Sequence, residues 1–498
     1  MESLSDTKWD VVISGTGLQH SLLALALSRS DKKVLHVDQY EYYGGAEAAF
    51  SLQEVDEWVE KVNGDAFKTF RNASLWKTTG EPSQEARQLS FSRAYTLTLS
   101  PQIIYTKSKL LSQLVSSKVY RQLEFQAVGN WWILDGEAGS ALKRLPSGRE
   151  DIFQDKSIDN RAKRSLMKFL KFVVDYENQP ETWQSHGDGG LAAFLSSQFQ
   201  FPQSLQTVIA ALTLSLNPPD KTKVQWALPR IARHLTSLGV FGPGFGAVVP
   251  KWGGGAEISQ VACRAGAVGG GVYVLGTGVK TIVAGTEDTE DTRQRTQVHL
   301  TNGEVVTTQH LIETDDMAVS DARQVSKAIA IVSSPLSYLF KGTVEGSPLA
   351  AVSVVVIPPH NLTIASMPQL NPIYIMVHSS ETGECPNGQC ILYATTLYSD
   401  ISKELIGQAL STFLQTAQED AELMYSLYYE QRQSSKSTTA SEPLDASLDL
   451  AFNDGILDEV EVQWRKVVGD VEEATFMRFE DREGMNAYDD DDEPTEDF

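Results

Sequence analysis

Two glycines near the start of the chain have the spacing of a nucleotide-binding loop. Gly15 and Gly17 lie between an apolar run, Trp9–Ile13, and a second apolar stretch, Leu18–Ser28. An acidic residue, Asp38, follows about twenty positions further on. In dinucleotide sites such a loop brings backbone N–H groups to a pyrophosphate, and the acidic residue binds a ribose hydroxyl. The pattern therefore predicts a cradle of the FAD- or NAD-binding type.

The third glycine position of this loop is occupied by a histidine, His20. Glycine at this position lets the helix pack closely on the strand, and an imidazole adds bulk beside the phosphate site. No lysine or arginine that could compensate lies between Gly15 and Ala26. Two hypotheses follow from the residues alone. The chain is a flavin-dependent oxidoreductase with a degenerate loop (Gly15, Gly17, His20), or the fold is retained and the cofactor is lost.

The elements around the loop indicate the fold class. Trp9–Ile13 and Lys33–Val37 read as buried strands joined by a helix over Leu18–Ser28, which is a β-α-β unit of a parallel sheet. From about 155 to 235 helical periods dominate, as in Arg161–Tyr176, and strand character returns over 272–400. We expect an α/β protein with a Rossmann-type, FAD-binding-like domain of mixed sheets and an inserted, mostly α-helical domain.

The expected domain order follows from these changes in pattern. The first part of the α/β domain spans 1–118, the helical domain 119–235, and the second part of the α/β domain 236–428. Residues 429–498 are expected to form a polar linker and an acidic C-terminal tail, since 429–445 are polar and 489–498 read DDDDEPTEDF.

Composition excludes several classes of function. The chain has 498 residues and a net charge of −23, so it repels phosphate backbones and no nucleic-acid partner is expected. Its longest apolar runs are shorter than the roughly 20 residues of a membrane span. Neither H-x-E nor C-x-x-C spacing occurs, so no metal site is expected. The three cysteines and residues 1–8, which lack the pattern of a secretion signal, favour a cytoplasmic location.

Three segments make the chain resemble a known family. Asp10–Gly45 resembles the first conserved region of the superfamily of Rab GDP dissociation inhibitors and Rab escort proteins. Lys251–Leu275 resembles its second region, and Ala94–Leu111 is a weaker match. The resemblance implies a fold related to FAD-dependent monooxygenases in which no flavin is bound, so no cofactor is expected.

Within this superfamily the chain is more similar to the escort branch, through Ser28–Asp38 with Ala48–Ser51 and through Ser379–Thr396. That branch implies a non-catalytic component. It binds GDP-bound Rab GTPases, presents them to the Rab geranylgeranyltransferase α/β heterodimer, and carries the geranylgeranyl-bearing product to membranes by transient contact. The alternatives are a Rab GDP dissociation inhibitor and, from another class, a flavin-dependent amine-oxidase-like enzyme.

The resemblance also implies a Rab-binding platform. It carries over to Tyr42, Tyr43, Glu257, Arg264 and Val274. Tyrosine and arginine commonly anchor interfaces. If the segment is helical, the glutamate and the arginine are seven residues apart and share one face. The alternative is that the tyrosines are ordinary turn aromatics and the two charged residues a solvated pair.

Two further surfaces are implied. The Rab C-terminal tail is expected on Ala94–Tyr105, with Tyr95, Ile103 and Tyr105 as contacts. The helical domain is expected to shelter the prenyl groups and to contact the prenyltransferase through an exposed phenylalanine. Phe172 is the better match and Phe169 its rival, because Phe169 shares a face with apolar neighbours. The alternative is that both phenylalanines are buried.

Overall fold

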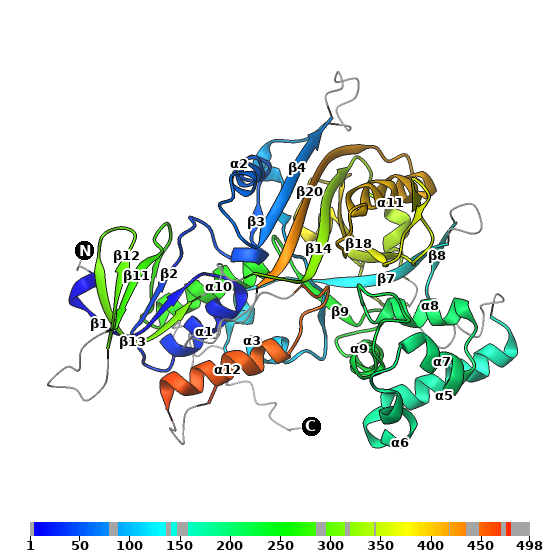
Figure 1. Cartoon of the computed structure of the whole chain (residues 1–498), viewed down its shortest axis with the longest axis horizontal. Helices are drawn as coiled ribbons and strands as arrows, with labels where there is room; N and C mark the ends of the chain where they lie inside the picture. Colours follow the sequence, from blue (N-terminus) through cyan, green and yellow to red (C-terminus); the bar gives the residue numbers. More distant parts are fainter. Residues whose placement is uncertain are drawn as a thin grey trace, which may run out of the picture.

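The computed structural model of the chain describes residues 4–78, 88–135, 141–146, 158–284, 295–313, 319–342, 345–417, 419–434, 448–469 and 475–479. In these residues two large β-sheets and a group of helices lie next to one another along the molecule (Figure 1). The expected fold class, an α/β protein with mixed sheets and an additional helical part, is confirmed.

The first sheet contains the N-terminal β-α-β unit. Its described strands run in the order β10 (Val272–Val274), β2 (Val34–Val37), β1 (Lys8–Ser14), β13 (Val305–Glu313), β12 (Thr296–Leu300) and β11 (Val279–Ala284). Neighbouring strands are parallel from β10 to β13 and antiparallel from β13 to β11. Helix α1 (Leu18–Ser28) joins β1 to β2.

Every residue of α1 is buried. Two helices from distant parts of the chain, α10 (Gly255–Val268) and α12 (Gly455–Val468), pack against it. A helix that is apolar on all sides requires such cover, because otherwise it would expose hydrophobic surface to water. The sequence LQHSLLALALS therefore specifies both the helix and its central position.

The second sheet is larger and separates two cores. Its described strands run in the order β4 (Phe70–Lys77), β20 (Leu423–Ser434), β14 (Val319–Val332), β19 (Cys390–Leu397), β18 (Ile373–Ser379), β15 (Val352–Ile357), β7 (Phe125–Asp135), β9 (Ala247–Pro250) and β6 (Ile104–Tyr105), with β8 (Ala141–Arg144) paired to β7. All of β15 is buried, since successive side chains enter opposite cores. Helix α2 (Leu52–Asn63) contributes to one core and α11 (Ser402–Thr416) to the other.

The helical part consists of α5 (Asn160–Val174), α6 (Pro180–Trp183), α7 (Leu191–Phe199), α8 (Gln203–Leu212) and α9 (Val224–Ser237). It has its own apolar core, drawn from α5, α7, α8 and α9 (Figure 1, green and cyan). The side chain of Asp159 caps α5 by accepting hydrogen bonds from the backbone N–H groups of Arg161 (2.7 Å) and Ala162 (2.8 Å). This cap fixes where the helix begins.

Shorter described elements complete the chain. They are η1 (Leu4–Asp6), η2 (Gly45–Glu47), β3 (Ala49–Phe50) paired with β5 (Leu97–Thr98), α3 (Lys109–Ser116), β16 (Thr363–Ile364) paired with β17 (Met367–Pro368), and the 3₁₀ turns Ser92–Ala94, Val119–Gln122, Tyr176–Asn178, Gln184–His186, Ser337–Phe340 and Ser380–Thr382. None of the described helices combines the length and apolar character that crossing a bilayer requires.

Two expectations drawn from local composition are wrong. Residues 429–434 are the end of strand β20, although they were expected to begin a polar linker, and 455–468 form α12. Glu430 is buried beside Arg71, whose Nε lies 2.7 Å from its carboxylate, so its charge is balanced inside the protein.

Strands β7 and β8 lie within 119–235 but belong to the large sheet, and the helices begin only at α5. The acidic residues 489–498 lie outside the described residues.

Candidate partner-binding surface and apolar cavity

The acidic residue of the predicted nucleotide cradle is already engaged by the chain itself. The carboxylate of Asp38 accepts hydrogen bonds from the Thr16 backbone N–H and hydroxyl, each at 2.7 Å, and from the Tyr40 N–H at 2.9 Å. Asp38 is buried, and burial raises its pKa while these donors oppose the shift. A ribose hydroxyl would have to displace this network.

A carboxylate also lies where a pyrophosphate would be held. The side chain of Glu47 lies beside the first turn of α1, and the Leu18 backbone lowers its pKa. A Cβ built on Gly17 would lie 3.5 Å from Glu47 Oε2. Burial raises the pKa of Glu47 to about 7, and its hydrogen bonds and Lys327 oppose the shift. The helix N-terminus that binds phosphate in dinucleotide folds thus faces a half-buried carboxylate of the chain itself.

His20 occupies the third glycine position, in the first turn of α1. It is buried, and burial followed by the nearby His36 lowers its pKa to about 3, so the imidazole is neutral. The cavity left beside Gly15–His20 has a volume of about 310 Å³. The residues present therefore do not fit a dinucleotide, because its diphosphate would meet the Glu47 carboxylate and its ribose would compete with Thr16. Among the described residues no group of three or more acidic, histidine or cysteine side chains could hold a metal ion.

The structure brings three of the five predicted platform residues together. Glu257 and Arg264 lie on α10, and Tyr43 lies in the turn that follows β2. Arg264 is exposed and the other two are half-buried. Burial raises the pKa of both Tyr43 and Glu257, and the positive charge of Arg264 opposes each shift, as expected for neighbouring groups.

Glycine allows the turn to approach α10 this closely. Gly44 has φ of 100°, and a Cβ at this position would lie 3.1 Å from Ala256 Cβ at the start of α10. Tyr42 differs from Tyr43: its ring stacks on Tyr40 at 5.2 Å and packs against the core of the large sheet. Val274 is half-buried at the end of β10.

The residues expected to contact a partner's C-terminal tail are core residues. Tyr95, Ile103 and Tyr105 are 1%, 0% and 2% exposed. The Tyr95 hydroxyl donates to Gln389 Oε1 at 2.7 Å, and the backbone N–H of Ile103 donates to Leu450 O at 3.0 Å. None of the three is exposed on the outside of the protein, and only Tyr105 reaches the cavity described below, so the expectation of an exposed docking site at these residues is wrong. The apolar side chains of this segment are therefore explained by its burial in the core.

The two phenylalanines expected at a prenyltransferase contact are also buried. Phe169 is 0% and Phe172 4% exposed, and both rings pack against Phe199. The alternative of two core phenylalanines is therefore correct, since the apolar stripe of α5 includes both. The large apolar side chains that this part of the chain does expose are others, among them Val174 (55%) and Phe241 (59%).

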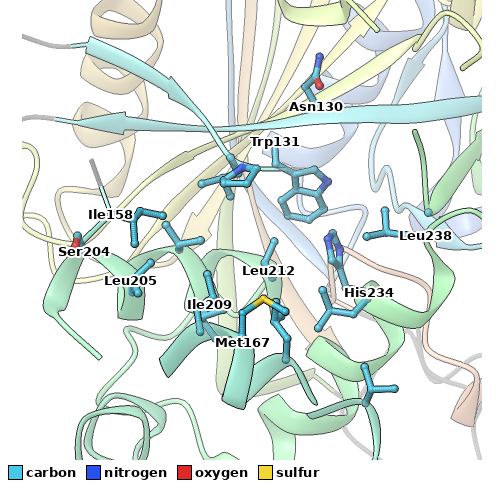
Figure 2. A pocket seen from close by; sticks show the side chains of 18 of the residues that line it. Asn130, Trp131, Ile158, Met167, Ser204, Leu205, Ile209, Leu212, His234 and Leu238 are labelled. Carbon is cyan, nitrogen blue, oxygen red and sulfur yellow. The ribbon is translucent and has the colours of Figure 1, made fainter. Parts of the chain in front are cut away.

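A large apolar cavity lies between the helical part and the edge of the large sheet (Figure 2). Its volume is about 1040 Å³, the upper end of the roughly 300–1,000 Å³ typical of small-molecule sites. Helices α5, α8 and α9 line it opposite β7 and β9, and the lining includes Trp131, Leu166, Met167, Leu205, Ile209, Leu212 and His234. His234 is neutral, because burial lowers its pKa to about 4, and its Nδ1 lies 3.3 Å from the Tyr105 hydroxyl. Sequence periodicity marks these residues only as apolar and gives no signal for the space between them.

Comparisons with known proteins place this geometry in a family. The model of the GDP dissociation inhibitor family matches residues 5–474. A protein of Saccharomyces cerevisiae named "Rab proteins geranylgeranyltransferase component A" is 32% identical over 392 residues, covering 78% of this chain and 61% of that protein. The protein of the same name from Candida albicans is 30% identical, covering 79% and 60%. The chain therefore spans about 60% of the length of these relatives.

A solved structure shows the same fold. The crystal structure of Rab GDI from Plasmodium falciparum superposes with a TM-score of 0.65 at 19% identity, covering 92% of this chain and 98% of that one. At this identity the likeness establishes the fold alone. The family match over nearly all of the chain goes further, and on that basis the protein belongs to the GDP dissociation inhibitor family.

Proposed function

We propose that this protein binds GDP-bound Rab GTPases, presents them to the Rab geranylgeranyltransferase α/β heterodimer, and delivers the prenylated Rab to membranes. It acts as the non-catalytic, substrate-presenting component. Membership of the GDP dissociation inhibitor family supports Rab binding, and the names of the two fungal relatives support the connection with geranylgeranyltransferase.

The observation that carries the proposal is the apolar cavity of about 1040 Å³. A protein that bound only the folded body of a GTPase would need a surface and no such cavity. An isoprenoid chain in water gains roughly 0.8 kcal/mol for each CH₂ group that it buries. The cavity therefore offers what a protein needs to keep a geranylgeranyl group out of water between transferase and membrane.

The Rab body is assigned to the platform of Tyr43, Glu257 and Arg264, of which Arg264 is exposed and the other two are half-buried. An arginine and a tyrosine beside a carboxylate can anchor an interface through hydrogen bonds and apolar contact at once. Val274, half-buried on β10, adds apolar surface, and Tyr42 anchors the turn by packing on Tyr40 and the core of the large sheet. In this proposal residues 1–118 and 236–428 carry the platform, and helices α5–α9 (160–237) shelter the lipid.

A reconstituted prenylation assay tests the proposal. Unprenylated Rab·GDP, the transferase heterodimer and geranylgeranyl diphosphate are combined with and without the full chain, and incorporation of the lipid into Rab is measured. Incorporation is expected to depend on the chain. If incorporation does not depend on the chain, but the chain extracts prenylated Rab from membranes, the alternative function of a Rab GDP dissociation inhibitor is correct.

The other alternative, a flavin-dependent oxidoreductase, is disfavoured by the cradle. Glu47 and the pairing of Thr16 with Asp38 use the groups that would hold a dinucleotide. The purified protein is expected to show no flavin absorption in the visible range. A stoichiometric flavin spectrum would contradict this reading of the cradle.

A further inference from the structure

One helix of the protein carries a stripe of positive charge. Arg161, Arg164, Lys168 and Lys171 are exposed on α5, and their spacing of three, four and three residues places them on one face. No aspartate or glutamate occurs between residues 160 and 174. This cationic stripe belongs to a chain whose net charge is −23, so it is a local departure from the overall charge.

None of the four side chains of the cationic stripe forms a salt bridge within the described part of the chain, although the Asp159 carboxylate caps the start of the helix. Arg161 donates from Nη2 to Gln200 Oε1 at 2.7 Å, and Lys168 Nζ lies 5.8 Å from the centre of the Phe199 ring. No described carboxylate forms an ion pair with any of the four cations. Four cations on one helix face that pair with no carboxylate of the described residues are available to an external anion.

An exposed apolar loop lies at the rim of the same cavity. Residues 238–243, here called the rim loop, follow α9 and expose Leu238 (36%), Val240 (44%) and Phe241 (59%). Leu238 lines the cavity, as does Val174 at the end of α5, which is 55% exposed. Lys168 and Lys171 of the cationic stripe line it as well. Cations and exposed apolar side chains therefore border one opening.

We infer that the cationic stripe and the rim loop form a face that docks on an anionic lipid bilayer, with the mouth of the cavity against the membrane. The inference rests on the proposed function, because it takes the occupant of the cavity to be a lipid that must leave into a bilayer. Anionic headgroups attract lysine and arginine, and aromatic and aliphatic side chains insert at the interface. The acidic remainder of the chain does not prevent docking, since charges further than about 10 Å away are screened by salt.

An acidic surface of another protein is the competing occupant of this face. The bilayer is favoured because the rim loop exposes large apolar groups beside the cations and because both border the lipid cavity. A bilayer accounts for the cations, for the exposed apolar groups and for their position beside the cavity. An acidic protein surface accounts for the cations only.

The test measures binding of the full chain, without Rab, to sedimented vesicles. Vesicles of phosphatidylcholine with roughly one third phosphatidylserine are compared with vesicles of phosphatidylcholine alone. Binding is expected only with phosphatidylserine and is expected to weaken as salt increases. The double variant Arg161→Gln/Arg164→Gln is expected to bind about 10–30-fold more weakly, since each cation near an anionic surface contributes about fivefold. The matched control Lys280→Gln/Lys341→Gln, at two exposed lysines elsewhere, is expected to leave binding unchanged.

The rim loop has its own variant. Phe241→Ser is expected to weaken vesicle binding about tenfold, and Phe91→Ser, at a phenylalanine that is 74% exposed, serves as its control. Equal binding to both kinds of vesicle, or equal loss in variant and control, would overturn the inference. So would a double variant that loses affinity for the transferase and keeps its affinity for vesicles, because the face would then belong to a protein. Affinity for Rab·GDP is measured separately: its absence refutes the proposed function and leaves the vesicle result standing.

Discussion

The cavity provides the sharpest test, through a single charge placed on its wall. Met167 lines the cavity beside Ile209 and Leu212, and Figure 2 shows the three side chains near one another. The side chain of Met167 is half-buried and is not part of the apolar core of the helical part. Met167→Glu therefore puts a carboxylate of similar length into the proposed lipid site with little effect on folding.

The size of the effect follows from the surroundings of Met167. A charged side chain in a fully apolar environment costs about 2.5–3.5 kcal/mol. Because Met167 is half-buried, we expect about half of this cost, about 1.5 kcal/mol, when a lipid replaces the water around the carboxylate. The affinity for geranylgeranylated Rab·GDP should fall roughly tenfold, and the affinity for unprenylated Rab·GDP should not change.

The assay compares these two affinities by titration of labelled Rab. The matched control is Met367→Glu, because Met367 is 48% exposed on β17 and does not line the cavity. If Met167→Glu weakens both forms of Rab equally, or has no more effect than Met367→Glu, the cavity does not hold the lipid. Thermal unfolding of both variants checks that the fold is intact.

Three further predictions concern the platform and the cradle. Arg264→Ala should weaken binding of unprenylated Rab·GDP about 5–30-fold, a cost of about 1–2 kcal/mol. The control variant Lys280→Ala should leave this affinity unchanged. An unchanged affinity of Arg264→Ala would count against the platform. Thr16→Val should lower the free energy of unfolding by about 1.5–3 kcal/mol, measured by urea denaturation, because Asp38 loses a buried hydrogen bond; an unaltered midpoint would contradict this. Burial lowers the pKa of His36 from 6.5 to about 4, so the unfolded chain binds a proton between these pH values and the folded chain does not. Its contribution of up to about 3 kcal/mol is therefore complete above pH 6.5 and is lost as the pH falls towards 4, and His36→Gln should flatten this decline in a pH series of thermal melts.

Features that depend on neighbours in sequence could be predicted. The β1–α1–β2 unit, its glycine turn and Asp38 follow from a pattern of about thirty residues, in which each choice agrees with the local structure. The apolar stripe of α5 likewise predicted the helix. The same stripe was less informative about function, because it does not distinguish a phenylalanine in the core from one at the rim.

Features that depend on distant contacts could not be predicted. Glu430 and Gln431 look like linker residues, yet both are buried in β20. There Arg71 forms an ion pair with Glu430, and the Ser100 hydroxyl donates a hydrogen bond to Gln431. Tyr105 belongs to a segment that matches a family motif, but its side chain lies under α9 beside His234. The cavity arises from the packing of helices against a sheet edge that is formed by strands far apart in the chain.

The altered cradle and the proposed platform are physically connected. Glu47 ends η2, which begins at Gly45, directly after the turn that carries Tyr43. The Glu47 carboxylate therefore lies next to Gly17, at the N-terminus of α1, because a Cβ at Gly17 would be 3.5 Å from its Oε2. Thr16 adds a second tie, because its backbone oxygen and its hydroxyl accept from the Gly44 N–H at 3.1 and 3.2 Å. Thr16, in the glycine loop, thus holds the backbone beside Tyr43, and a rigid turn lowers the entropy that binding a partner costs. The contacts of Thr16 that occupy the cradle are therefore also the ones that would hold the proposed platform in place.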